Sequence, residues 1–291
     1  MMSYIEPHAE TVDEETEMQR YLYDLNGYVV IKDVLSNEQV ANLNDALDEH
    51  IPPVPDNWLE LSQTERLGLY HTYRFGMAGG SYDTGPGFLA WGQAFVDLID
   101  QPNVMDLMRW QLGEYFRLDR IFGMRMLDGM PSGRLHSDYG ASAPFTNAPR
   151  GNLHPQPAHQ ALHGFGVAVF NLTDSGPDTG GLRVIPGSHN SRVRLPKSIR
   201  RDQSTDITVC PEAPAGSVTL FSEATTHGTQ AWTASHERRS ILYKYCTSNL
   251  TWSRTRVTAP ESAQLTPMQE RLLAEPAGGG WFFASAFDED R

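Results

Sequence analysis

Two histidines and one aspartate stand at spacings that suit a single metal ion. His136 and Asp138 are separated by one residue. In an extended segment the side chains of residues i and i+2 lie on the same face, so this imidazole and this carboxylate can contact one ion together. His227 lies 89 residues after Asp138 (227 − 138) and directly precedes Gly228. Two imidazoles and one carboxylate on one triangular face leave three coordination positions open, an arrangement that suits iron(II) in oxygen chemistry.

An arginine downstream of His227 can complete such a site. Two of the open positions fit a 2-keto acid and the third fits dioxygen, and the distal carboxylate of the keto acid then needs a buried cation. Arginine suits this task because its planar fork matches a carboxylate and stays charged. Arg238 lies 11 residues after His227 (238 − 227) and opens a strand-like run. Arg239 is a competitor, but neighbouring residues of a strand face opposite sides, and the spacing favours Arg238.

The elements that must position these residues begin with helices. Met18, Leu22 and Leu25 follow helical spacing and predict a first helix, which Gly27 ends. Residues 28–31 are rich in β-branched side chains and predict a strand. The sequence of residues 36–39 is a capping box, which predicts the start of a second helix.

The sequence pattern changes from helical to strand-like at about residue 116 and stays so to about residue 250. Short apolar runs alternate there with clusters of Gly, Pro, Asp and Ser, which is typical of β-strands joined by turns. Because helices come first and strands follow without βαβ alternation, a parallel doubly wound sheet is disfavoured. We expect a mainly β protein with flanking helices, built on a double-stranded β-helix of the jelly-roll or cupin-like kind. The predicted strands are 121–127, 164–172, 183–185, 207–209, 217–221 and 240–245.

The remaining segments complete a single predicted domain over residues 1–291. Residues 52–90 carry many Pro, Gly and Tyr with little periodicity, and we interpret them as a long, partly ordered connection. The predicted organisation is mostly helical support and lid segments over 1–115, the jelly-roll core over 116–250, and a C-terminal extension over 251–291. Further helices are predicted at 91–100, 102–112 and 267–274.

Four blocks of the sequence resemble the phytanoyl-CoA dioxygenase family, and together they span most of the chain. They are LNGYVVIKDVLS at 25–36, the His-Ser-Asp of 136–138, GGLRVIPGSH at 180–189, and His-Gly-Thr at 227–229 followed by Arg238. The resemblance implies an iron(II)- and 2-oxoglutarate-dependent dioxygenase.

The family's residues carry over where these blocks match. His136, Asp138 and His227 become the metal ligands, Arg238 becomes the anchor of 2-oxoglutarate, and Thr229 becomes a hydroxyl donor to the same carboxylate. No catalytic residue beyond the metal centre is expected. The implied reaction consumes dioxygen, hydroxylates an unactivated C–H bond of a small molecule, and releases succinate and carbon dioxide.

Other outcomes stay open on the sequence alone. The same cofactor chemistry can give desaturation, epoxidation or cyclisation, because the pose of the substrate decides the outcome. A cupin-like module that binds metal and 2-oxoglutarate without turnover is a second alternative. A zinc hydrolase is a third, and it would need a general base near the metal, for which Glu223 is the nearby candidate.

Substrate contacts are expected on the loops and strand ends around the barrel mouth, since such positions usually select the ligand. The candidates are Arg74, Arg125, Tyr139 and Trp232. The segment 151–163 holds His154, His159 and His163, and its role stays open between a lid and a second metal site.

Composition narrows the partners. The formal net charge is −13, which disfavours nucleic acid and anionic membranes because both need a basic surface. The acidic N-terminal segment has no apolar run, and no stretch approaches the roughly 20 apolar residues of a membrane span. We therefore expect a cytoplasmic enzyme of small molecules, and the oligomeric state stays open.

Overall fold

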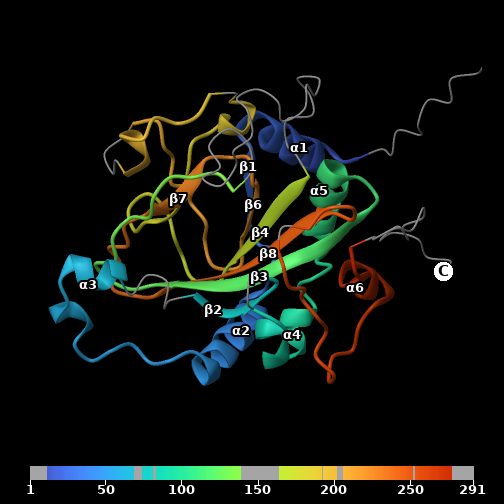
Figure 1. The fold of residues 1–291 in the computed structure, drawn as a ribbon, viewed down its shortest axis with the longest axis horizontal. Helices are drawn as coiled ribbons and strands as arrows, with labels where there is room; N and C mark the ends of the chain where they lie inside the picture. Colours follow the sequence, from blue (N-terminus) through green and yellow to red (C-terminus); the bar gives the residue numbers. More distant parts are fainter. Residues whose placement is uncertain are drawn as a thin grey trace, which may run out of the picture.

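A six-stranded antiparallel sheet forms the centre of the molecule in the computed structural model (Figure 1). Its strand order is β1-β6-β4-β8-β3-β2. The strands are β1 (Tyr28–Ile31), β2 (Arg74–Ala78), β3 (Phe116–Met126), β4 (Phe165–Asn171), β6 (Val218–Ser222) and β8 (Arg238–Thr247). The structure describes residues 12–68, 74–80, 83–138, 164–191, 193–201, 206–251 and 253–276.

A second, two-stranded sheet of β5 (Gly181–Val184) and β7 (His227–Gln230) faces the large one. Isolated bridges extend it, from His136 to His227 and from Val184 to Val209. An apolar cluster fills the space between the sheets, and Leu182 of β5 packs against it. Its buried members are Phe122, Val167, Val169, Phe221 and Leu242. This pair of facing sheets is the double-stranded β-helix that the sequence predicted.

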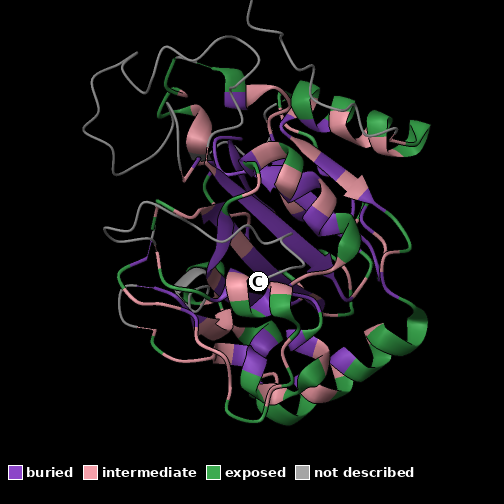
Figure 2. Ribbon diagram, turned by 90° about the vertical axis from the view of Figure 1, so that its right-hand side faces the viewer, coloured by how far each residue is buried: buried purple, intermediate pink, exposed green. Residues whose placement is uncertain are grey.

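The main hydrophobic core lies on the other face of the large sheet, under the helices. Figure 2 shows the sheet as the most buried part of the molecule, with helices whose outer sides are exposed. On β8 the alternate residues Ile241, Tyr243 and Tyr245 point into this core. The two tyrosine hydroxyls donate to the carbonyl oxygens of Phe95 and Ile99, at 2.6 and 2.8 Å. The large sheet therefore has a helix-covered face and a face that looks into the barrel.

The helices begin and end where local sequence signals place them. Asp13 caps α1 (Glu14–Asn26), and Gly27 ends it with a φ of 79°, a left-handed value that favours glycine. Ser36 and Gln39 form the predicted capping box of α2 (Asn37–His50). The other helical segments are η1 (Trp58–Glu60), α3 (Gln63–Gly68), η3 (Gly87–Trp91), α4 (Gln93–Val96), α5 (Pro102–Leu112), η5 (Ser188–Asn190), η6 (Ile199–Arg201) and α6 (Pro267–Leu272). Over the described residues, no helix is both long and apolar enough for a membrane span.

The first helix is present as predicted, but the apolar residues that predicted it are not the ones most deeply buried. Met18 and Leu25 are about half exposed, whereas Tyr23 is fully buried. The hydroxyl of Tyr23 donates to Gln111 Oε1 at 2.6 Å, and Arg20 pairs with Asp106 at 2.8 Å. Both partners belong to α5, so this polar pairing determines which face of α1 is buried.

Two further expectations need correction. Residues 52–90, expected to be a long and partly ordered connection, contain β2, which pairs with β3 at the edge of the large sheet. Residues 207–209, expected to form a strand, make only a single bridge, at Val209. His227 follows β6 in the chain and is the first residue of β7.

Candidate metal centre

Backbone pairing brings the three predicted ligands together. The N–H of His136 donates to the carbonyl of His227 at 2.8 Å, and the N–H of His227 donates back at 2.7 Å. Asp138 follows two residues after His136, so its carboxylate joins the same group. One ligand atom from each of His136, Asp138 and His227 lies within 4.8 Å of the others. Since ligand atoms about 2.1 Å from one ion lie roughly 3–4 Å apart, the three side chains fit one metal ion after a small contraction.

The two imidazoles are oriented by backbone carbonyls. Nδ1 of His136 lies 2.9 Å from the carbonyl oxygen of Arg134, and Nδ1 of His227 lies 2.8 Å from that of Thr225. A carbonyl oxygen only accepts, so each Nδ1 carries the hydrogen and each Nε2 keeps its lone pair for a metal. Burial lowers the pKa of His136 and lowers that of His227 to about 3. Both imidazoles are therefore neutral near pH 7, which is the form that binds metal ions.

A buried lysine fixes the third ligand. Lys244 of β8 donates to Asp138 Oδ2 at 2.8 Å and pairs with Glu223 Oε1 at 2.5 Å. Burial alone would raise the pKa of Asp138, but Lys244 and the two imidazoles hold it well below its ordinary value. Burial also raises the pKa of Glu223 to about 7, against the opposing effect of Lys244. The Oδ1 of Asp138, 3.6 Å from His136 Nε2, is the oxygen turned toward the imidazoles.

The glycine after His227 is required by a close backbone approach. A Cβ on Gly228 would lie 3.0 Å from the carbonyl oxygen of Arg134 and 3.3 Å from that of Gly133. This is the segment that leads into His136 and pairs with β7. A side chain at Gly228 would therefore require one of the two ligand-bearing segments to shift by a few tenths of an ångström.

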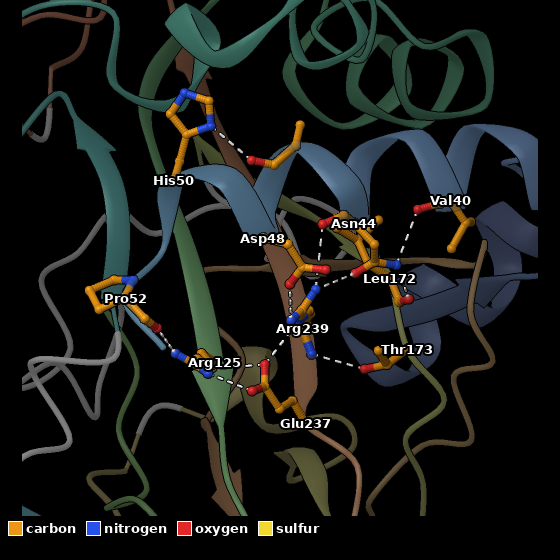
Figure 3. A network of polar contacts seen from close by, with 11 residues as sticks. Val40, Asn44, Asp48, His50, Pro52, Arg125, Leu172, Thr173, Glu237 and Arg239 are labelled. Carbon is orange, nitrogen blue, oxygen red and sulfur yellow. Dashed lines mark hydrogen bonds and ion pairs between the residues drawn. The ribbon is translucent and has the colours of Figure 1, made fainter. Parts of the chain in front are cut away.

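The two candidate arginines lie on opposite faces of β8. Arg238 is buried in the barrel interior, where its Nη1 lies 3.7 Å from Met126 Sδ. Arg239 points to the helical side, where it binds Asp48 of α2 at 2.6 Å and Glu237 at 3.0 Å (Figure 3). Only Arg238 therefore shares a face with the metal-ligand cluster.

Hydroxyl groups near Arg238 suit a carboxylate. Ser240 follows two residues after Arg238 on the same face, and its fully buried Oγ has no hydrogen-bond partner among the residues that the structure describes. Thr229 of β7 lies two residues after His227, is buried, and accepts a hydrogen bond from the N–H of Gly133 at 2.8 Å. A buried hydroxyl without a partner is costly. The interior end of β8 therefore fits the acidic end of 2-oxoglutarate, and the ligand cluster fits the metal.

The four predicted substrate contacts do not all lie at the site. Arg74 of β2 faces the barrel interior, with its guanidinium 4.9 Å from the centre of the Phe122 ring. Arg125 does not line the site: it faces the helical side and binds Glu237 and the carbonyl of Pro52 (Figure 3). Trp232 is also a correction, since it is fully buried, packs in a separate apolar cluster, and donates its indole N–H to His236. Tyr139 lies outside the described residues, as does the segment 151–163.

Sequence reasoning missed Lys244, Ser240 and Arg120 as members of the interior face. For Ser240 and Lys244 the signal was present, because every second residue of β8 after Arg238 faces the same side. Arg120 needed the strand register, in which it lies directly opposite Lys244. Alternation along β8 from Arg238 would therefore have identified Ser240 and Lys244 from the sequence, but not Arg120.

Comparisons with known proteins agree with this geometry. The family model for phytanoyl-CoA dioxygenase matches residues 23–240, well over half of the chain. No curated protein matches the chain in sequence. The solved structure of HygX from Streptomyces hygroscopicus with nickel and 2-oxoglutarate is similar at 18% identity and a TM-score of 0.60, covering 82% of this chain and 88% of that one.

Two further structures share the fold. EctD from S. alaskensis, with 2-oxoglutarate and 5-hydroxyectoine, has 18% identity and a TM-score of 0.56, covering 84% of this chain and 82% of that one. SnoN, a non-heme alpha ketoglutarate dependent epimerase from nogalamycin biosynthesis, has 19% identity and a TM-score of 0.50, covering 81% and 83%. The matched family model spans the ligand cluster and the start of β8, and the chain belongs to the phytanoyl-CoA dioxygenase family of iron(II)- and 2-oxoglutarate-dependent oxygenases.

Proposed function

We propose that this oxygenase hydroxylates an unactivated C–H bond of a small molecule. In the balanced reaction, one oxygen atom of dioxygen enters the substrate as a hydroxyl, and the other enters succinate as 2-oxoglutarate loses carbon dioxide. His136, Asp138 and His227 would hold iron(II). The observation that carries the proposal is the convergence of these three side chains inside a barrel whose interior also holds Arg238.

The roles of the chain's own residues follow from their contacts. The two carbonyl-bonded imidazoles and the lysine-held carboxylate of Asp138 would present three ligand atoms in fixed directions. Arg238 would bind the distal carboxylate of 2-oxoglutarate, with Thr229 as a hydroxyl donor and Ser240 beside it. Bound iron supplies the activation of dioxygen, and the protein contributes positioning and a dry site. The apolar cluster around Phe122 would exclude water.

The structures of similar fold support a small-molecule substrate. HygX has been solved with nickel, 2-oxoglutarate and hygromycin B bound. EctD has been solved with 5-hydroxyectoine. SnoN is an epimerase, so the same fold and cofactors also serve an outcome without net hydroxylation. The mass of the product therefore belongs in the test.

The test is a metabolite-library screen for iron-dependent, substrate-stimulated succinate formation by the full chain. We expect a product heavier by one oxygen atom; a product lighter by two hydrogen atoms, or one of unchanged mass, would contradict hydroxylation. Asp138→Ala should abolish succinate formation and weaken binding of Mn(II) in calorimetric titration. Asp206→Ala, at an exposed position, is the matched control. Metal binding and turnover that survive Asp138→Ala would refute the ligand assignment.

A further inference from the structure

A group of cations lines the barrel interior beside the metal-ligand cluster. Arg120 of β3 lies directly opposite Lys244 of β8, and Arg74 of β2 lies opposite Met124. All three cations surround one aromatic ring. The centre of the Phe122 ring is 4.9 Å from Arg74 Cζ, 5.4 Å from Arg120 Cζ and 5.6 Å from Lys244 Nζ.

β2 has a bulge beside this group of cations. The pairing of β2 with β3 shifts between Phe75 and Ala78, and Gly76 between them has a φ of 54°. Phe75 packs on the helical side, whereas Met77 packs on the interior cluster with Phe122. The apolar cluster that contains Phe122 and Met77 therefore lies beside the cations.

Among the described residues, Lys244 has carboxylate partners and the two arginines have none. Lys244 pairs with both Asp138 and Glu223. Over the residues that the structure describes, neither Arg74 nor Arg120 forms an ion pair, and the buried Nε of each lacks a hydrogen-bond partner. Asp83, Asp138 and Glu223 favour the charged form of Arg120, but among the described residues none of them forms an ion pair with it.

The other arginines of the same strand give a direct contrast. Arg117 pairs with Asp119 at 2.7 Å, and Arg125 pairs with Glu237. Both therefore have the carboxylate partner that a buried guanidinium normally needs. Arg120 instead has Arg74 as a charged neighbour, and burial together with this like charge lowers its pKa. Two like charges held close together in a partly buried setting repel each other, and an anion between them would relieve this repulsion.

We propose that Arg74 and Arg120 bind an anionic group of the substrate, so that the substrate is a small molecule with a carboxylate or a phosphate. This inference rests on the proposed function, since it concerns the molecule that is oxidised at the metal centre. It adds Arg120 to the site and separates two anion-binding tasks. Arg238 and Ser240 serve the acidic end of 2-oxoglutarate, and the pair on β2 and β3 serves the substrate.

The first arm of the test needs no substrate. An arginine kept for a ligand gives the free protein little stability, whereas an arginine in an ion-pair network stabilises it. We expect Arg120→Gln to leave the melting temperature unchanged or to raise it by up to about 3 °C. The matched control on the same strand, Arg125→Gln, should lower it by several degrees. If Arg120→Gln is as destabilising as Arg125→Gln, Arg120 is structural and the inference is wrong.

The second arm measures anion binding by thermal shift, with acetate, phosphate, and chloride at equal ionic strength, in the presence of saturating 2-oxoglutarate. We expect acetate or phosphate to stabilise the wild type more than chloride does, and the Arg74→Gln/Arg120→Gln variant to lose that gain. The anion with the larger effect identifies the substrate group as a carboxylate or a phosphate. Equal shifts for all three anions in the wild type would overturn the inference.

The third arm uses the library screen. Compounds that stimulate succinate formation should be anionic. Arg120→Gln should raise the KM for such a compound at least about tenfold, with a smaller change in the KM for 2-oxoglutarate. Arg109→Gln, on α5 and paired with Glu114, is the control for loss of one positive charge. Stimulation by neutral compounds alone would overturn the inference and leave the proposed function intact. Absence of any iron-dependent succinate would instead remove the proposed function.

Discussion

Replacing Arg238 or Arg239 by alanine should damage different properties of the same strand. Arg238 faces the barrel interior, and in the role proposed for it, its loss removes a charge-assisted contact to 2-oxoglutarate. Such a contact is worth about 1.5–3 kcal/mol. Since about 1.4 kcal/mol corresponds to a factor of ten, we expect the KM for 2-oxoglutarate to rise roughly ten- to a hundredfold in Arg238→Ala.

Arg239→Ala should instead weaken the fold. The guanidinium of Arg239 joins Asp48 of α2 to Glu237, next to Arg125 (Figure 3). Asp48 is 61% exposed, so solvent reduces that contact to less than about 1 kcal/mol. Glu237 keeps Arg125 as a partner. The loss is therefore about 1–2 kcal/mol, which for a chain of this size lowers the melting temperature by roughly 2–6 °C.

The stability difference should also depend on pH. Burial alone would raise the pKa of Glu237, but hydrogen bonds and charges of Arg125 and Arg239 outweigh it and lower the pKa below its ordinary value of 4.5. A carboxylate with a lowered pKa stabilises the fold above the pKa of the unfolded state, and this contribution is lost as the pH falls through the folded pKa. The gap between wild type and Arg239→Ala should thus be full at neutral pH and should narrow below pH 4.5.

The assays are initial rates of succinate formation against 2-oxoglutarate concentration, and thermal unfolding followed by circular dichroism at several pH values. The reasoning fails if Arg239→Ala raises the KM as much as Arg238→Ala does. It also fails if Arg238→Ala is the less stable variant while its KM is unchanged. A stability gap that is constant down to acidic pH would remove Glu237 from the explanation.

Three other substitutions test the supports of the site. Lys244→Met should weaken metal affinity roughly 10–100-fold in calorimetric titration, because the Asp138 carboxylate loses the group that orients it, and Lys244→Arg should recover part of the loss. Gly228→Ala should also lower metal affinity, since its Cβ would lie 3.0 Å from a carbonyl oxygen in the adjoining segment; an unchanged affinity would mean that the segments adjust freely. Trp232→Ala should cost about 3–5 kcal/mol in denaturant unfolding, as expected for a fully buried indole, and a selective change in substrate KM with normal stability would restore it as a substrate contact.

The local signals of the sequence were enough for most of the barrel and for the pair of His136 and Asp138 within the ligand group. The capping box at Ser36 and the proline at position 102 act within one helical turn, so they are visible without the fold. The pair of His136 and Asp138 is recognisable because strand geometry puts residues i and i+2 on one face. His227 needed the order of several family blocks, because nothing local joins residues 89 positions apart.

The errors have one physical origin, which is that a face or a partner depends on distant strands. Arg74 sits in a stretch without alternation, because a glycine bulge interrupts the pattern there. Arg120 and Arg125 are both arginines of β3 and face opposite sides of it because they are five positions apart, but the register with β8 is needed to show which of them faces the barrel interior. Lys244 is an ordinary strand residue until Asp138, 106 positions earlier, is placed against it.

The charge of the whole chain and the charge of the site have opposite signs, and distance explains how both can matter. The net charge of −13 acts mainly from the surface, and salt screens such charges beyond about 8–10 Å. The interior cations act over a few ångströms in an apolar setting, where an interaction is much stronger than in water. Arg238 and Arg120 can therefore select acidic molecules inside a protein whose surface repels them. With an acidic surface and cations inside the barrel, the protein should recognise acidic small molecules by contacts within the site. Long-range attraction from the surface should not contribute to their binding.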